Sequence, residues 1–433
     1  MTGRIPRWGR CSVLAAAALT LAGTLTACSS SSDAVGSDAE QTIRFVWWGN
    51  EDRAKATEKV VALFEKEHPN IKVQTEFSGY PAYVQKLTTQ IAGGNAPDLL
   101  QLDRPTFGEY QQKRQLAELT PYVGKTLKAD GISKSLLAGG EAEGKQFAMP
   151  AGLTTQVFVY DKDLYKKAGV TVPEDGWTWK QFATDMAKVQ AESGRAGTTD
   201  FGWAIDWFES WLHQNGKQLY TSDRKLGFTE GDLERYWSML AEMRKQKGVT
   251  AAEDTTKMDG SAQNSALVAK QSGSEIAYDS SVTSYVSTYQ GKLGFAPLPS
   301  DSKTESGMAA LPPVYYGIAK TSSHKDAAAL LLDFILNDSE AGKVLGTTRG
   351  TPPNSDVATS VCASATGADK DTCDFQSKVK DKLSPSDTWL WPSGSSAIKT
   401  DFQRVYDDVI FGKTSASAGA EKVVKNAKQS LGQ

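Results

Sequence analysis

The sequence is poor in the residues that build metal and redox sites. Its 433 residues include only three histidines (His68, His213 and His324) and four cysteines. None of the histidines stands at the spacing of a zinc ligand set. There is no Cys-x-x-Cys pair and no His-Glu-x-x-His motif. We therefore expect neither a metal site nor a cofactor.

Motifs of nucleophilic and phosphate chemistry are also missing. There is no Gly-x-Ser-x-Gly elbow. The stretch 139–145 comes near a phosphate-binding loop, but Gln146 stands where a serine or threonine must reach magnesium. The sequence does not exclude a catalytic pair of carboxylates, because 51 acidic residues always offer pairs and the sequence does not fix their separation. We expect a protein that is not an enzyme, with a glycoside-active enzyme as the less favoured alternative.

Two further absences concern partners. The formal net charge is −3, and no basic cluster with interleaved aromatic residues is present, so we expect no nucleic-acid partner. After residue 28, no apolar run approaches the roughly 20 residues that a membrane-spanning helix needs. We therefore expect any membrane attachment to lie at the N-terminus.

The N-terminus has the pattern of an export signal. Arg4, Arg7 and Arg10 precede an apolar run over 11–21, which is too short for a comfortable membrane span. Leu-Thr-Ala-Cys at 25–28 looks like a bacterial lipobox. This pattern predicts a signal peptide over 1–27. An ordinary secretory signal with an accidental cysteine is the alternative.

A lipobox implies a lipid on the cysteine that follows the cleavage point. We expect Cys28 to carry a diacylglycerol that anchors the chain to the outer face of the cytoplasmic membrane. Residues 28–40 are rich in serine and weakly acidic, and they predict a flexible tether.

The remaining cysteines fit an exported protein. Cys11 leaves with the signal and Cys28 takes the lipid, so Cys362 and Cys373 are left close together in a polar stretch. In an oxidising compartment this favours one short disulfide over two unpaired thiols.

Apolar residues from Gln41 onward alternate between two periods. Runs with period 2 predict strands, and runs with helical spacing between them predict helices. The expected order is strand 43–47, helix 51–66, strand 71–77, helix 81–91 and strand 98–103. Strands alternating with helices over about 60 residues predict a parallel α/β sheet.

That topology places two side chains before any function is assumed. Ligands of open parallel sheets bind beyond the carboxyl ends of the strands. Trp48 ends the first strand and Asp103 ends the third. We expect an aromatic face and a carboxylate to project into one crevice.

Tryptophan is unusually frequent, with eleven residues in the chain. A pyranose has apolar C–H faces and a polar rim, so an aromatic ring with carboxylates around it complements a sugar. About half of these rings are expected to be structural. Trp211 and Trp237 are the first two assigned to the core.

The order of several short motifs resembles family 1 extracellular solute-binding proteins of carbohydrate ABC importers, the maltose-binding-protein-like group. The pieces that carry this resemblance are Trp47-Trp48-Gly49, 92–98 (AGGNAPD), Gln101-Leu102-Asp103, Pro150 with 159–162 (VYDK), 177–182 (WTWKQF), 294–299 (GFAPLP), 391–394 (WPSG) and Phe411-Gly412-Lys413. No single piece is specific, but their order and spacing are.

The resemblance implies an α/β fold of the two-lobed periplasmic-binding-protein-like class (type II), with the ligand cleft between the lobes. Three hinge crossings are expected at 151–156, 311–316 and 349–354. The first lobe then comprises 41–152 and 315–348, and the second comprises 153–314 and 349–433.

The resemblance also implies a set of ligand contacts. They are Trp48, Asp103, Asp279, Tyr315, Tyr316 and Arg349, with Trp177, Trp207 and Trp391 as weaker additions. Arg104 joins Arg349 as a basic residue of the expected cleft. One departure is that Ser280-Ser281 stands where many relatives carry a stacking tryptophan.

The function implied is capture of a monosaccharide or, more favoured, an oligosaccharide, and delivery to the permease subunits of an ABC importer by a monomeric lipoprotein. The same fold binding a non-sugar or anionic solute is the alternative.

Overall fold

The computed structural model describes residues 40–173, 176–384 and 390–433. The expected signal peptide, the lipidated Cys28 and nearly all of the expected tether lie outside the described residues. None of the described helices is both long and apolar enough to cross a membrane.

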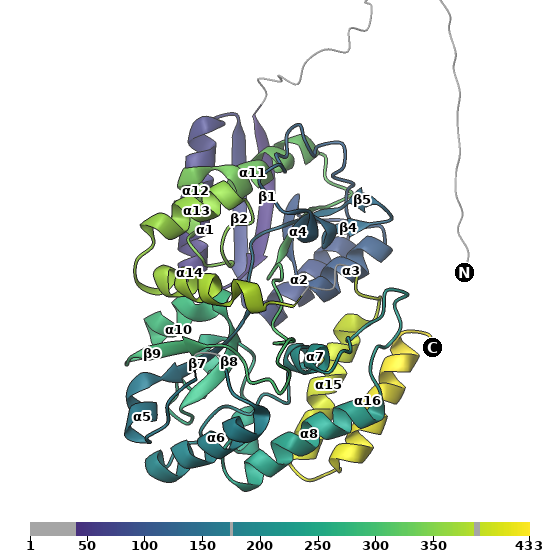
Figure 1. Ribbon diagram of the computed structural model, residues 1–433. Helices are drawn as coiled ribbons and strands as arrows, with labels where there is room; N and C mark the ends of the chain where they lie inside the picture. The colour runs from purple at the N-terminus through teal and green to yellow at the C-terminus, as the bar shows by residue number, and fades with distance from the viewer. Residues whose placement is uncertain (1–39, 174–175, 385–389) are drawn as a thin grey trace, which may run out of the picture. The chain divides into compact units, whose positions relative to one another are not determined.

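The first of two main sheets has five strands in the order β2-β1-β3-β10-β6 (Figure 1). Its strands are β1 (Gln41–Trp48), β2 (Ile71–Ser78), β3 (Leu99–Leu102), β6 (Ala148–Pro150) and β10 (Tyr315–Ile318). Strand β1 is parallel to both β2 and β3, whereas β10 is antiparallel to β3 and β6. The parallel sheet predicted for the strands between residues 43 and 103 is confirmed.

Helices cover both faces of this sheet. They are α1 (Glu51–Glu67), α2 (Tyr80–Ala92), α3 (Arg104–Gln112), α4 (Lys134–Ala138), α11 (Lys325–Asn337) and α12 (Ser339–Leu345). Helix α1 starts after Asn50, whose side chain accepts a hydrogen bond from the Arg53 amide at 2.9 Å. Asp103 caps α3 in the same way.

The second sheet is antiparallel, in the order β8-β7-β9. Its strands are β7 (Gln156–Asp161), β8 (Ser274–Tyr278) and β9 (Leu293–Ala296). The helices that pack around it include α5 (Lys162–Lys167), α6 (Trp179–Ser193), α7 (Ile205–Gln214), α8 (Glu230–Lys245), α10 (Val282–Thr288), α14 (Gly367–Val379), α15 (Ser395–Ile410) and α16 (Ala416–Ser430).

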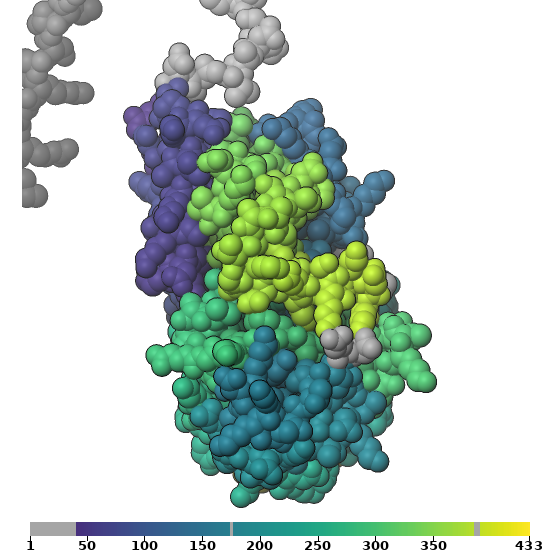
Figure 2. Space-filling model, turned by 60° about the vertical axis from the view of Figure 1, so that its left-hand side comes forward, coloured from purple at the N-terminus to yellow at the C-terminus, as the bar shows by residue number. Residues whose placement is uncertain are grey.

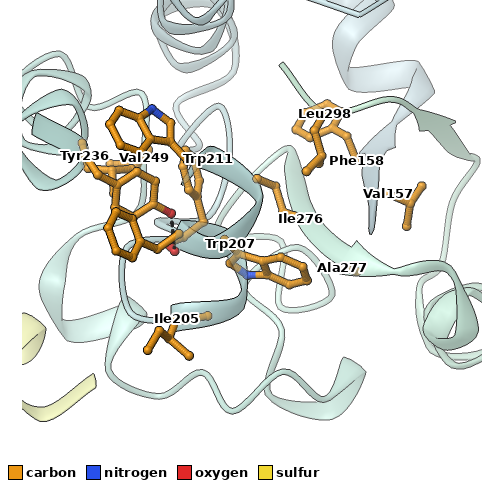
Figure 3. Close-up of a cluster of buried hydrophobic side chains, with 14 of the residues drawn as sticks. Val157, Phe158, Ile205, Trp207, Trp211, Tyr236, Val249, Ile276, Ala277 and Leu298 are labelled. Carbon is orange, nitrogen blue, oxygen red and sulfur yellow. Dashed lines mark hydrogen bonds between the residues drawn. The ribbon is translucent and has the colours of Figure 1, made fainter. Parts of the chain in front are cut away.

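The core of the second sheet is rich in aromatic rings. Trp211 and Trp237 are both buried there, as expected, and the Trp237 indole donates to the Gly202 carbonyl at 3.2 Å. Figure 3 shows Trp207, Trp211 and Tyr236 in this cluster. The four-residue spacing of Trp207 and Trp211 therefore reflects the buried face of α7.

Segments 151–156 and 311–316 connect the parts that carry the two sheets, and the first of them bonds both to the second and to segment 349–354. Leu153 and Thr351 exchange a pair of backbone hydrogen bonds of 2.8 and 2.9 Å, and Thr154 and Leu311 do the same. The segments expected as hinge crossings thus lie side by side.

The chain after the third crossing spans both parts. Helix α13 (Ser355–Ser364) packs against α12, and α14 packs against α10. Figure 2 shows this yellow-green segment between the purple and teal regions. Cys362 on α13 and Cys373 on α14 form the predicted disulfide.

Candidate functional site

The carboxyl end of β1 presents an aromatic group. Trp47 points into the core, and because successive side chains of a strand face opposite ways, Trp48 points to the other face and is partly exposed. The ring of Trp48 packs against Tyr80 and Tyr83, with centroid distances of 5.5 and 5.4 Å. Three rings therefore line this edge of the first sheet.

Asp103 lies beside these rings. Its carboxylate accepts hydrogen bonds from the Thr106 amide at 3.0 Å and from the Tyr80 hydroxyl at 2.5 Å. Burial, followed by the neighbouring charge of Asp103, raises the pKa of Tyr80. Trp48 and Asp103 are thus connected through Tyr80, as the strand-end argument required.

Arg104, the next residue, reaches to the second sheet's helices. Its Nη1 donates to Oε1 of Glu209 on α7 at 3.1 Å, and its Nη2 donates to Oε2. The guanidinium also lies 4.2 Å from the ring centroid of Trp391. Burial is the largest single influence and lowers the pKa of Arg104, but the charge and hydrogen bond of Glu209, with the charges of Tyr278 and Asp206, together raise it overall.

A second carboxylate, Asp206, lies on α7 one turn before Glu209. Its Oδ2 is 3.2 Å from Nζ of Lys399 on α15, and its Oδ1 accepts from the Tyr278 hydroxyl at 3.3 Å. The Trp207 ring packs on Tyr278 at 5.0 Å. Burial raises the pKa of Asp206, but the charges of Lys399 and Arg104 outweigh it and lower the pKa.

Together these side chains form one cluster of rings and charges between the two sheets, which we call the cleft cluster. It comprises Trp48, Tyr80, Asp103, Arg104, Asp206, Trp207, Glu209, Tyr278, Trp391 and Lys399. Charges from the two sides interact, because Asp103 contributes to the raised pKa of Lys399 and Asp206 to that of Tyr80. Rings beside carboxylates and cations are suited to the apolar faces and hydroxyl rim of a sugar.

Half of this cluster was predicted from the sequence. Of the predicted contacts, Trp48, Asp103 and Arg104 come together here with Trp207 and Trp391, which are themselves buried (9% and 3% exposed). Tyr80, Asp206, Glu209, Tyr278 and Lys399 were missed. Tyr80 opens α2 two residues after β2 ends, so the argument that located Trp48 could have found it. Tyr278 ends β8 in an antiparallel sheet, where that argument does not apply, and the other three lie on helices and carry no sequence signal.

Three further predicted rings are also buried, and their ring contacts and hydrogen bonds lie outside this cluster. Trp177 is only 2% exposed, and its indole donates to Asp185 at 2.8 Å. Tyr315 packs on Phe107, and Tyr316 packs on Phe45. We leave these three residues out of the proposed ligand contacts.

Asp279 occupies a different kind of position, at the crossings. It is 0% exposed and accepts from the Thr154 hydroxyl at 2.5 Å, the Thr155 amide at 3.2 Å and the Gln376 amide at 2.8 Å. Burial raises its pKa to about 6, although these hydrogen bonds act in the opposite direction. This carboxylate therefore joins the first crossing to α14.

Arg349 is also buried, at the third crossing. It lies on the α1 side of the first sheet, where its Nε donates to Gln101 and its Nη2 to Thr57, both at 2.9 Å. Trp48 and the cleft cluster face the opposite side of the same sheet. The structure thus separates Arg349 from the cluster.

No group of three or more acidic, histidine or cysteine side chains that could hold a metal ion occurs among the described residues. The cleft cluster consists of hydrogen-bonding and aromatic groups, which suits reversible binding.

Fold and site define a two-lobed periplasmic-binding-protein-like protein of type II. The sequence profile described as "Bacterial extracellular solute-binding protein" matches residues 48–342. The chain belongs to this family.

Solved structures and curated relatives agree with that assignment. The family 1 solute-binding protein of Alicyclobacillus acidocaldarius shares 30% identity, with 92% of this chain and all of that chain covered and a TM-score of 0.68. An oligogalacturonide-binding protein of Yersinia enterocolitica, in complex with saturated digalacturonic acid, has a TM-score of 0.79 at 19% identity, with 90% of this chain and all of that chain covered. The arabinooligosaccharide-binding protein of Bacillus subtilis is 24% identical over 332 residues, or 73% of this chain and 74% of that protein.

The chain spans about half the length of the first curated relatives it matches. These are putative binding proteins of Brucella abortus and Brucella suis, 27% identical over 208 residues, which is 45% of this chain and 48% of theirs.

Proposed function

We propose that this protein is a lipid-anchored, exported binding protein that captures an oligosaccharide in the cleft cluster and passes it unaltered to the permease subunits of an ABC importer. The carrying observation is the partly exposed Trp48 ring, which packs on Tyr80, whose hydroxyl donates to the Asp103 carboxylate and is also influenced by the charge of Asp206. The names of relatives that bind arabinooligosaccharides or oligogalacturonides support a carbohydrate as the solute.

The proposed mechanism is closure of the two lobes around the sugar. A solute favours the closed form only through its differential affinity for that form. Changing the ratio of closed to open molecules from 1:99 to 99:1 takes about 5.5 kcal/mol. Hydrogen bonds and stacked rings supplied from both sides of the cleft cluster would provide this difference.

Calorimetry with a panel of neutral and acidic oligosaccharides tests the proposal. We expect one class to bind, and Trp48→Ala to weaken binding by roughly 5- to 150-fold, since stacking on an aromatic ring contributes about 1–3 kcal/mol. Phe411→Ala is the matched control, because Phe411 is an exposed ring on the turn after α15. A panel that gives neither heat nor a change in tryptophan fluorescence would refute the proposal.

The lipid anchor is tested separately. We propose that Cys28 carries the diacylglycerol, so Cys28→Ser should release the protein from the membrane fraction and remove the lipid mass from the N-terminal peptide. Cys362→Ser is the control, because its cysteine pairs within the folded chain.

A further inference from the structure

Two arginines meet where β1, α1 and the third crossing come together. Arg53, on the first turn of α1, donates to the Trp48 carbonyl at 3.2 Å and to the Thr348 carbonyl at 2.5 Å. Arg349 donates to the Gln101 side chain and to the Thr57 hydroxyl. All four acceptors are neutral oxygen atoms.

Neither guanidinium has an acidic partner within ion-pair distance among the described residues. Arg349 is only 4% exposed, and its Nη1, which carries two N–H donors, is buried with no hydrogen-bond partner in the described part of the chain. A guanidinium stays protonated in proteins, so it cannot escape burial by becoming neutral.

The positive charges of Arg53 and Arg349 also repel each other. Burial, followed by the charge of Arg349, lowers the pKa of Arg53 to about 9, and burial lowers the pKa of Arg349. Buried charges are normally paired, because an uncompensated one is costly. Elsewhere in the fold the rule holds, since the buried carboxylate of Asp200 pairs with Arg244. The Arg53–Arg349 site therefore lacks a negative charge.

We propose that a small anion, either an oxyanion such as a carboxylate or phosphate group or a halide, binds between Arg53 and Arg349 and receives the Nη1 donors of Arg349. Planar guanidinium groups match carboxylate and phosphate oxygen atoms in pairs. The anion is a free inorganic ion or a small free acid, because Arg349 lies on the α1 side of the sheet, away from the cleft cluster.

Binding here would reach both the cleft and the crossings. The Trp48 carbonyl accepts from Arg53 and from the Gln101 side chain, and Gln101 in turn accepts from Arg349. Arg53 also holds Thr348, one residue before the third crossing. An anion between the two guanidiniums would fix the backbone of Trp48 and that crossing in one arrangement.

The first test needs no sugar and therefore does not depend on the proposed function. Thermal unfolding of the full chain is followed in a low-salt zwitterionic buffer during titration with sodium chloride and with sodium phosphate. We expect a saturating rise in the melting temperature, because a ligand of the native state stabilises it by mass action. The rise should disappear in Arg349→Gln and in Arg53→Gln, whereas Arg235→Gln, which removes a largely exposed arginine, should keep it.

A second measurement covers the case in which the arginine variants do not fold. Crystals of the unaltered protein soaked in sodium bromide should show an anomalous peak between the two guanidinium groups. Equal shifts of the melting temperature in the unaltered protein and its three arginine variants, together with no bromide peak between Arg53 and Arg349, would overturn the inference. Ordered water would then be the partner of Arg349.

Sugar binding is measured beside the anion titrations, so that the anion site and the proposed function are tested separately. Sugar binding without a response to any anion or acid would refute the anion site but keep the proposed function. An anion response without any sugar binding would refute the proposed function but keep the anion site.

Discussion

The guanidinium of Arg104 on α3 and the carboxylate of Glu209 on α7 form a two-point ion pair that joins helices of the two sheets. Both side chains are largely buried, and Arg104 also covers one face of the Trp391 ring. Arg104 and Tyr220 together bury the Trp391 ring, so a sugar could stack on Trp391 only if it displaced Arg104.

A double-mutant cycle measures this pair. Glu209→Gln or Arg104→Met alone should lower the free energy of unfolding by about 3–5 kcal/mol, because each leaves a buried charge without its partner. The double variant should lose much less than the sum. Chemical denaturation gives the coupling, and single effects that add to within about 0.5 kcal/mol would show that the two residues act independently.

Asp279 should make stability depend on pH. Its folded pKa of about 6 lies above the ordinary value of 3.8, so the folded state binds its proton more tightly than the unfolded chain does. The stabilisation from this group is present below about pH 4 and is lost as the pH rises to about 6, with a total near 3 kcal/mol. Asp279→Asn should flatten the unfolding free energy across this interval.

The exposed Asp130 provides the comparison for that experiment. Asp130→Asn should leave the pH profile of the parent protein intact. A profile for Asp279→Asn that still falls between pH 4 and 6 by the full amount would assign the dependence to another buried acid, such as Glu275, whose pKa burial raises to about 7.

Gly152 lies at a close approach between two crossings. A Cβ atom there would stand 2.1 Å from the Arg349 carbonyl oxygen, which is backbone and cannot turn away. Gly152→Ala should destabilise the protein by about 1–3 kcal/mol. Gly231→Ala, in a helix with no atom closer than 3.7 Å to the new carbon, should be neutral or stabilising. Equal melting temperatures for the two variants would contradict the tight packing of the crossings.

Removal of the disulfide should have a moderate effect. The Cys362–Cys373 bond closes a loop with a sequence separation of 11 residues. Replacing both cysteines by serine should cost about 2–3 kcal/mol, mainly through the greater freedom of the unfolded chain. Denaturation under oxidising and reducing conditions checks this, because the serine variant should be indifferent to reductant.

The first sheet could be predicted because apolar residues with strand periodicity and apolar residues with helical periodicity follow each other in separate runs up to Asp103. The positions of Trp48 and Asp103 followed from strand ends alone. Burial of Tyr315 and Tyr316 could not be read in the same way, since β10 lies between β3 and β6 and its two faces are both covered.

The other differences have the same origin in long-range packing. Asp279 follows a strand, as a ligand-binding carboxylate would, but side chains 125 and 97 residues away enclose it. Asp206 and Lys399 become neighbours only when α7 meets α15. Local patterns carry no information about such pairings.

The paired backbone hydrogen bonds of Leu153 with Thr351 and of Thr154 with Leu311 join three separate chain segments into a narrow ribbon. A ribbon bends readily about one line but resists shear and twist, because either motion would break paired hydrogen bonds. We therefore expect the lobes to open and close by rotation about a single hinge axis. The amides of these four residues should be among the slowest to exchange with deuterium, whether or not solute is present.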